Sequence, residues 1–218
     1  MITIQHEVKE LFPDICVGLL TGSVINTDKD DALWRVINLE SENLKSIHTI
    51  ESLREIPGIK MGKSAYRLLG KDPNRYRISA EALLRRIVKG NRLHQIHTLV
   101  DLLNLVSIRT GLTIGGFDKQ KISGRLSLGI GHENEEFEAI GRGELNIHRL
   151  PVYRDEIGAI GSPTSDCVRT MMMPETTEFL MIITGFYGPS GIGDCIIMLQ
   201  ELASKYISGK NFVTKIVS

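Results

Sequence analysis

The stretch HTLVDLLNLVSIRTGLTIGGFD, residues 97–118, contains the point at which the sequence pattern changes from helical to strand-like. Up to residue 110, apolar side chains recur at helical spacing, so one face of this segment must pack against a core. Gly111 ends that pattern, and short strand-like runs separated by turn residues follow it. Helices therefore come mainly before this point and strands mainly after it, which predicts an α+β fold rather than an alternating α/β fold.

The rest of the chain also has most of its expected helices before the central stretch and most of its expected strands after it. The expected helices span residues 29–44, several shorter pieces of 47–90, 97–110 and 194–208. The expected strands span residues 15–21, 112–117, 125–130, 136–140, 150–154, 178–187 and 212–217. A length of 218 residues suits one domain. We therefore expect residues 1–218 to form a single domain, in which a helix-rich part (1–110) and a strand-rich part (111–218) share one core.

The overall composition is that of a globular protein, with 42% hydrophobic and 24% charged residues. The 26 basic and 26 acidic side chains balance, which excludes binding of nucleic acid or membrane through overall charge alone. The start of the chain lacks a secretory pattern, and the longest apolar run, residues 179–183, is too short to span a bilayer. Together with three isolated cysteines, these features predict a reduced, cytoplasmic protein without membrane contact.

Basic side chains are concentrated in residues 54–92, although the whole chain is neutral. This basic segment holds eleven basic and three acidic residues, a net charge of +8, and the remaining 15 basic and 23 acidic residues give −8. Lys and Arg neutralise phosphates, and the interleaved Tyr side chains can stack on unpaired bases, so the pattern is typical of an RNA-binding surface. The residues that we expect to contact RNA are Lys63, Arg67, Lys71, Arg75, Tyr76 and Arg77.

A structural interpretation of the same segment is that its basic side chains pair with acidic residues elsewhere in the chain. The available acidic stretch comprises Glu133, Glu135, Glu136 and Glu138. Within the segment, Ser79 has the character of a helix N-cap, and Glu81 and Arg85 lie at the i,i+4 spacing that favours an ion pair.

A polar stripe lies on the otherwise apolar helix expected at residues 97–110. His97, Asp101 and Asn104 fall at positions i, i+4 and i+7, so they share one face or the entry turn of that helix. Short polar groups beside an apolar face can bind a small ligand by directed hydrogen bonds. Alternatively, Thr98 and Asp101 form a capping box, an explanation that does not extend to Asn104. Asn104 is therefore the strongest candidate for ligand binding.

A metal site formed by His94, His97 and Asp101 is a further alternative, but these residues lack a recognised ligand spacing. The sequence also contains no Cys-x-x-Cys pair. We therefore expect neither a metal nor a cofactor.

Several motifs together resemble the editing module of the phenylalanyl-tRNA synthetase β subunit and the free-standing B3/B4-domain proteins related to it. The helix of residues 97–104 and the following stretch of residues 115–118 match this module in order and approximate spacing. Further matches are Lys121, Ile122, Gly124, residues 157–161, Ser165, Thr176 and Thr177, and the part from Arg67 to Arg86 is similar to the free-standing members. The resemblance covers roughly residues 60–187.

This resemblance implies a three-layer α/β/β fold built on a β-sandwich of unusual topology. It also implies an activity, because the synthetase module hydrolyses tyrosine that is mischarged onto the phenylalanine tRNA, in a pocket between its two subdomains. The implied partners are tRNA and the amino-acid moiety of an aminoacyl-tRNA, and no DNA is expected. Pocket residues expected from matched motifs or from positions beside them are Asn104, His97, Thr98, Gly115, Gly116, Arg142, Gly158, Thr164 and Ser165.

Three positions depart from the family's polar pocket. Leu103 stands where the family has Thr, Gly115 where it has His, and the apolar residues 181–183 where it has Glu. Ester hydrolysis needs a positioned water and stabilisation of the developing oxyanion, and recognition of a tyrosine hydroxyl needs buried polar partners. The amino acid is therefore expected to differ from tyrosine.

Three functions are compatible with these observations. The first is an editing-like protein that binds tRNA and hydrolyses a misacylated aminoacyl-tRNA in trans, without an aminoacylation core. The second is a non-catalytic RNA-binding module. The third is a small-metabolite binding protein whose basic face pairs internally.

Overall fold

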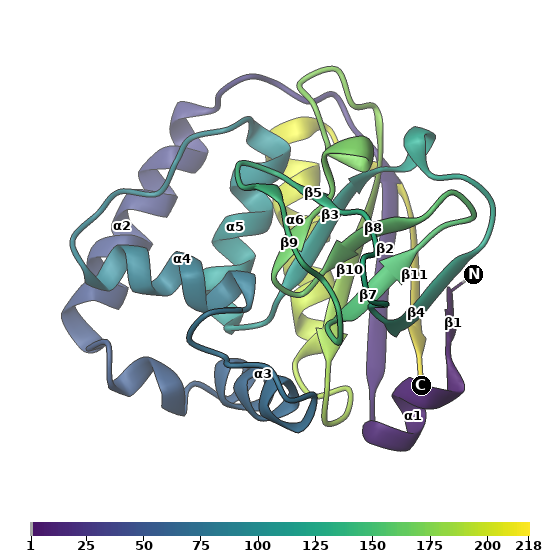
Figure 1. Ribbon diagram of the computed structural model, residues 1–218. Helices are drawn as coiled ribbons and strands as arrows, with labels where there is room; N and C mark the ends of the chain where they lie inside the picture. Colours follow the sequence, from purple (N-terminus) through teal and green to yellow (C-terminus); the bar gives the residue numbers. More distant parts are fainter. Residues whose placement is uncertain (1) are drawn as a thin grey trace.

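Two β-sheets pack face to face, and helices cover the outer face of one of them, in the computed structural model, which describes residues 2–218 (Figure 1). Side chains link the two sheets directly. The hydroxyl of Tyr153 in one sheet lies 2.6 Å from the Thr184 hydroxyl in the other, and the Phe117 ring packs over Gly161. The predicted α+β class and the three-layer α/β/β arrangement are confirmed.

The four-stranded sheet is antiparallel and forms the middle layer. Its order is β11 (Lys210–Val217), β2 (Cys16–Ser23), β10 (Glu178–Gly185) and β3 (Ile114–Asp118). The central strand β10 pairs with β2 along its whole length and with β3 over residues 179–183, all of which are buried. The continuous apolar run of residues 179–183 thus corresponds to a strand that is buried on both faces.

The five-stranded sheet forms the outer layer opposite the helices. Its order is β1 (Ile2–Ile4), β4 (Leu126–Ile130), β7 (Pro151–Arg154), β8 (Ala159–Ser162) and β9 (Ser165–Asp166). The β1–β4 pair is parallel and the other pairs are antiparallel. A small hairpin of β5 (Glu138–Ala139) and β6 (Gly143–Glu144) lies beside this sheet, bridged to it at Cys167.

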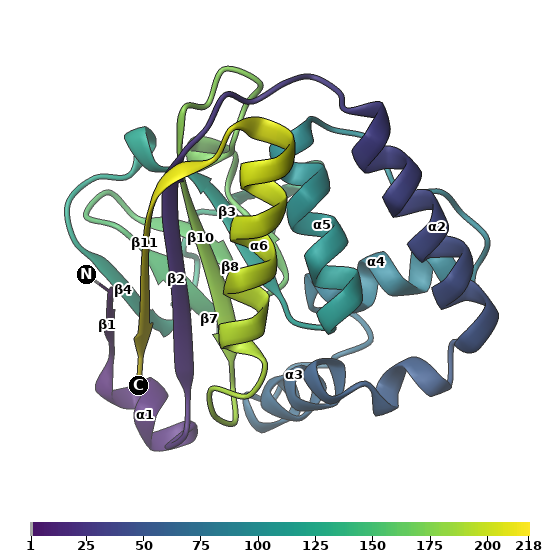
Figure 2. The same ribbon diagram turned by 180° about the vertical axis from the view of Figure 1, so that it is seen from behind.

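The helical layer has two levels. Helices α5 (Thr98–Thr110) and α6 (Ile192–Ile207) lie directly on the four-stranded sheet, and α2 and α4 pack outside α5 (Figure 2). The other helices are α1 (His6–Leu11), α2 (Asp31–Ile47), η1 (Ser52–Glu55), α3 (Pro57–Leu68), α4 (Ser79–Val88), η2 (Lys119–Lys121) and η3 (Val168–Thr170). No helix within residues 2–218 is long and apolar enough to cross a bilayer.

The change of pattern at Gly111 corresponds to a helix end in the structure. Gly111 adopts a left-handed conformation (φ 68°) and its N–H bonds to the Ser107 carbonyl, which closes α5 and starts the connection to β3. Nine residues of α5 are buried, so the helix is enclosed on more than its predicted apolar face. Five short elements of six residues or fewer were not expected from the sequence, namely β1, α1, β6, β8 and β9.

Two predicted helix caps are wrong by one residue. The N-cap of α5 is His97, whose Nδ1 accepts from the Val100 N–H at 3.4 Å, and Thr98 is the first helical residue. The N-cap of α4 is Ile78, so Ser79 lies inside the helix and its N–H donates to the Pro163 carbonyl. In α5 the capping side chain therefore lies one residue earlier than expected, and in α4 the carbonyl of Pro163, far away in the sequence, accepts from the start of the helix.

Candidate functional site

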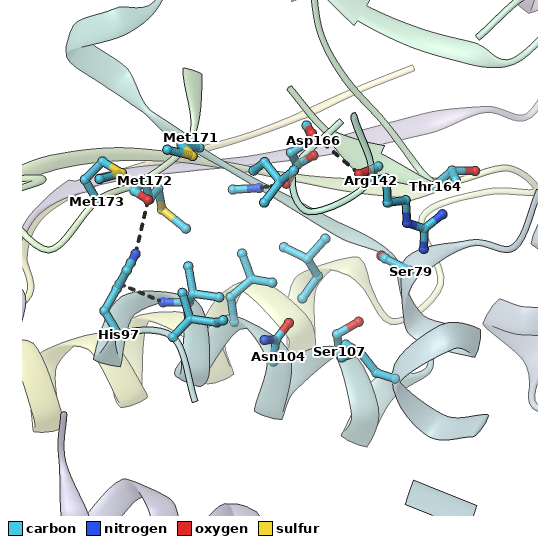
Figure 3. Close-up of a pocket in the computed structure, with 18 of the residues that line it drawn as sticks. Ser79, His97, Asn104, Ser107, Arg142, Thr164, Asp166, Met171, Met172 and Met173 are labelled. Atoms are coloured by element: carbon cyan, nitrogen blue, oxygen red, sulfur yellow. Dashed lines mark hydrogen bonds between the residues drawn. The ribbon is translucent and has the colours of Figure 1, made fainter. Parts of the chain in front are cut away.

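A cavity of about 480 Å³ lies between α5 and the loops and strand ends beside β9 (Figure 3). This volume is within the range of roughly 300–1,000 Å³ that is typical of small-molecule sites. The cavity is lined by Ser79, Leu83, Ile96, His97, Val100, Leu103, Asn104, Ser107, Ile114, Gly116, Ile140, Arg142, Ser162, Thr164, Ser165, Asp166, Met171, Met172, Met173 and Pro174. The lining is largely apolar, with a few polar groups that converge from different elements.

Six of the nine expected pocket residues line this cavity, although they come from four separate segments of the chain. They are His97, Asn104, Gly116, Arg142, Thr164 and Ser165. Antiparallel pairing of β8 with β9, and the approach of β3 to both, bring these segments together. The structure therefore brings these six residues together at one cavity.

The other three expected pocket residues lie outside the cavity. The Thr98 hydroxyl is buried against the Thr27 hydroxyl at 2.6 Å, on the side of α5 that faces the chain before α2. Gly115 is buried in β3 and turns toward Phe117 and Asp166. Gly158 lies in the β7–β8 loop, where its N–H donates to Asp155.

Of the three residues in the polar stripe of α5, His97 and Asp101 form hydrogen bonds within the protein, whereas Asn104 forms none in the described part of the chain. His97 accepts from the Asn26 amide at 3.0 Å through Nδ1, so its Nε2 carries the proton and donates to the Met172 carbonyl at 3.2 Å. Burial lowers the pKa of His97, which keeps the ring neutral at physiological pH. This histidine fixes the loop of residues 171–174 against the start of α5.

Asp101 points away from the cavity. Its carboxylate accepts from the Trp34 indole N–H at 2.6 Å and from the Ile96 N–H at 3.1 Å, and burial raises its pKa. Asp101 therefore holds α2 to α5 and takes no part in the pocket or in a metal site with His97.

Asn104 differs from both neighbours, because its side-chain amide makes no hydrogen bond with any of residues 2–218. Figure 3 shows it on α5 at the wall of the cavity, beside Ser107. The Ser107 hydroxyl donates to the Leu112 carbonyl at 2.8 Å and is therefore engaged in ending the helix. Asn104 alone offers a free donor and a free acceptor from this helix to a ligand.

Asp166 is the one carboxylate among the cavity residues, and it is not among the residues expected from the sequence. It is partly buried, and its Oδ2 accepts from the Gly116 N–H at 2.9 Å. Burial raises the pKa of Asp166 to about 7, against the smaller opposing effect of that hydrogen bond. No sequence motif marks Asp166 as a pocket residue. Its position at the cavity follows only from the pairing of β8 with β9.

The basic segment does not pair with acidic residues elsewhere. Within residues 2–218, its ion pairs are Lys60–Glu55 at 3.2 Å, Lys63–Glu81 at 3.1 Å and Arg85–Glu81 at 3.8 Å, all internal to the segment. The i,i+4 pair expected from the sequence is thus confirmed, and the expected pairing with the acidic stretch is wrong. Glu135 of that stretch instead pairs with Arg154 at 2.6 Å.

Lys63 is less suited to RNA contact than expected, because its side chain is mostly buried and pairs with the buried Glu81. Arg67 and Arg75 are exposed, whereas Lys71, Tyr76 and Arg77 are partly buried. The Lys71 ammonium lies 4.6 Å from the centre of the Tyr76 ring and the Arg75 guanidinium 5.6 Å from it.

Arg149, from the strand-rich half, joins this group. Its guanidinium is next to Gly70, and burial together with Arg149 and Arg75 lowers the pKa of Lys71. The backbone of Arg149 is in the left-handed region (φ 61°) and is held by a bond from its N–H to the Gly131 carbonyl. We call Lys71, Arg75, Tyr76 and Arg149 the cationic cluster. None of its three cations forms an ion pair with an acidic residue in the described part of the chain.

The protein thus has an α+β fold with a cavity beside α5, and Ser79 and Leu83 of the basic segment are among the residues that line this cavity. The chain belongs to the B3/4 domain family, whose match covers residues 62–190. A solved structure similar to it is an N-terminal fragment of the phenylalanyl-tRNA synthetase β subunit from Pyrococcus horikoshii, with 11% identity and a TM-score of 0.48 over all of this chain. This chain spans about half of that fragment, 54% of its length. No curated protein shows a significant match.

Proposed function

We propose that this protein binds tRNA and hydrolyses a misacylated aminoacyl-tRNA in trans. The observation that carries the proposal is that two residues of the basic segment, Ser79 and Leu83, line the pocket. An RNA held by the segment would therefore have its end beside the cavity. Membership of the B3/4 domain family and the likeness to a fragment of a tRNA synthetase support an RNA-related role.

A hydrogen bond connects the two regions. The Tyr66 hydroxyl of α3, in the basic segment, lies 2.8 Å from the hydroxyl of Thr164 in the pocket lining, and both side chains are buried. The position of α3 is thereby tied to the pocket wall. We propose that residues 1–218 act as one domain for this reason, and that they do so in the cytoplasm, which the three free cysteines support.

In the proposed reaction, water attacks the carbonyl carbon of the ester between the amino acid and the terminal ribose. A C–O bond forms from the water, the bond to the ribose oxygen breaks, and that oxygen takes up a proton as free amino acid and tRNA are released. The Asn104 amide can donate to the oxygen on which negative charge develops. Substrate hydroxyls and backbone amides supply the remaining polarisation.

A non-catalytic RNA-binding function is the second candidate. The apolar side chain of Leu103 lies against Gly116 at the cavity wall, where the family has polar groups nearby, and this favours binding without hydrolysis. A deacylation assay with a panel of mischarged tRNAs separates the two. Release of an amino acid supports the first function, and salt-sensitive tRNA binding without release supports the second. Absence of both would leave a small-metabolite binding protein.

The cationic cluster gives a specific prediction for tRNA binding. Arg149→Ala is expected to weaken tRNA binding and to reduce the slope of log K against log salt concentration by roughly one, because one phosphate contact is lost. Arg125→Ala, which removes an exposed arginine of the same half, is the matched control and should leave the slope unchanged. Fluorescence anisotropy at several salt concentrations measures both. Equal slopes for the two variants would place the RNA elsewhere.

A further inference from the structure

We propose that Asp166 binds the α-ammonium group of the aminoacyl moiety and that the pocket selects amino acids with apolar side chains. This inference rests on the proposed function and deepens it, because it assigns a substrate class to the same pocket. It also assigns a role to a residue that no motif identified.

One oxygen of the Asp166 carboxylate accepts a hydrogen bond within the described part of the chain and the other does not. Oδ2 accepts from the Gly116 N–H at 2.9 Å, whereas Oδ1 accepts no hydrogen bond from residues 2–218. Two glycines enclose Oδ1, because a Cβ atom would lie 3.1 Å from it at Gly115 and 2.9 Å from it at Gly161. Larger residues at either position would crowd the carboxylate. Both glycines therefore pack closely against an acceptor that the described chain does not use, and Asp166 itself lines the cavity.

The charge of Asp166 also has no partner in the described part of the chain. Arg142 is the one Arg or Lys side chain in the cavity lining, and it is exposed and forms no ion pair with Asp166. Figure 3 shows its guanidinium turned toward Ser79 rather than toward the carboxylate. A partly buried carboxylate without a cation is unfavourable by itself, which agrees with the raised pKa of Asp166. A cation from a ligand would remove this cost.

The remainder of the lining decides what kind of cation fits. Leu103, Ile114 and Met172 line the same cavity, so the ligand must present apolar surface close to its cationic group. An α-amino acid does so, since one carbon separates its ammonium from its side chain. An ammonium also has three donors for carboxylate oxygens and for the free Asn104 carbonyl. Arg142 at the open side suits the phosphates of the attached nucleotide.

Asp166→Asn separates a ligand-binding role from a structural one. Asn keeps the shape of the side chain and an oxygen that can accept from the Gly116 N–H, but it removes the charge. If Asp166 serves the ligand, this variant should unfold at the same temperature as the wild type or higher, while it loses ligand affinity. If the carboxylate serves the fold, the variant should unfold at a lower temperature.

The probes are amides of amino acids, titrated calorimetrically into the full chain. Leucinamide should bind the wild type more tightly than tyrosinamide, and more tightly than 4-methylpentanamide, which lacks only the amino group. Asp166→Asn should lower leucinamide affinity by about 10- to 100-fold and abolish its advantage over the deaminated amide. The proposal is overturned if the deaminated amide binds as well as leucinamide, if tyrosinamide binds as well, if the variant binds leucinamide unchanged, or if no amide binds.

Failure of this proposal and failure of the proposed function give different results. Retained deacylation of a mischarged tRNA by Asp166→Asn, with unchanged kcat/KM, would refute the ammonium contact and leave the editing function intact. Conversely, ammonium-dependent amide binding by a wild-type protein that neither binds tRNA nor releases amino acid would support the Asp166 contact and refute the editing function.

Discussion

Asn104→Ala is expected to reduce the rate of deacylation of a mischarged tRNA by about 100- to 1,000-fold while the affinity for tRNA changes little. Asn104 supplies the one side-chain amide in the cavity lining, and that amide makes no bond with the rest of the described chain. Its loss therefore removes a contact available only to the substrate and its transition state. The phosphate contacts that we propose lie mostly on the basic segment, so this substitution should leave them in place.

Single-turnover deacylation and anisotropy titration measure the two quantities separately. Asn38→Ala is a matched control, because Asn38 is exposed on α2 and the exchange has the same intrinsic effect on a helix. An Asn104 variant that retains the wild-type rate would show that the α5 amide is dispensable for hydrolysis.

Asp101→Ala is expected to lower the free energy of unfolding by about 2–4 kcal/mol. The substitution leaves the Trp34 indole N–H and the Ile96 N–H without their acceptor, in a region where Asp101 is only 1% exposed. It also loosens the contact between α2 and α5. Asp101→Asn keeps one acceptor oxygen and should cost clearly less. Urea unfolding measures both variants, and an alanine variant as stable as the wild type would contradict this assignment.

The same carboxylate predicts a pH dependence of stability. Burial raises the pKa of Asp101 in the folded state above its unfolded value of about 3.9, so the folded protein holds this proton more strongly. The contribution of Asp101 is therefore fully favourable below the unfolded pKa and declines as the pH rises through the folded one. In Asp101→Asn this decline should be absent. A stability profile of the Asn variant that parallels the wild type across this interval would exclude Asp101 as its source.

The main division of the fold could be predicted because it depends on local periodicity. The helix before Gly111 and the apolar strand β10 follow from repeated spacing over ten or more residues and from a continuous apolar run. Strands β8 and β9 escaped prediction, since four and two residues are too few to establish a period. Their pairing with each other and with β7 gives them their structure.

In the candidate site, too, residues with a local sequence signal could be predicted and residues placed by distant neighbours could not. Asn104 could be predicted because neither capping nor an ion pair explained a polar residue on an apolar helix. Asp166 and Arg149 could not be predicted, because their neighbours lie far away in the sequence. Asp166 accepts from the Gly116 N–H, and Arg149 lies near Lys71. His97 was placed correctly at the cavity, but its contacts to Asn26 and to the Met172 carbonyl make it structural.

The contacts of His97 and Asn26 have a consequence for the range of side chains that the pocket accepts. They hold the carbonyls of Met172 and Met173, at 3.2 and 3.0 Å, and so they fix only the main chain of that loop. The thioether side chains above it are unbranched and can change rotamer without moving the backbone. The methionine side chains of this wall can therefore adapt to a ligand while the main chain of the loop stays in place. The pocket should therefore bind amino acids with different apolar side chains with similar affinities.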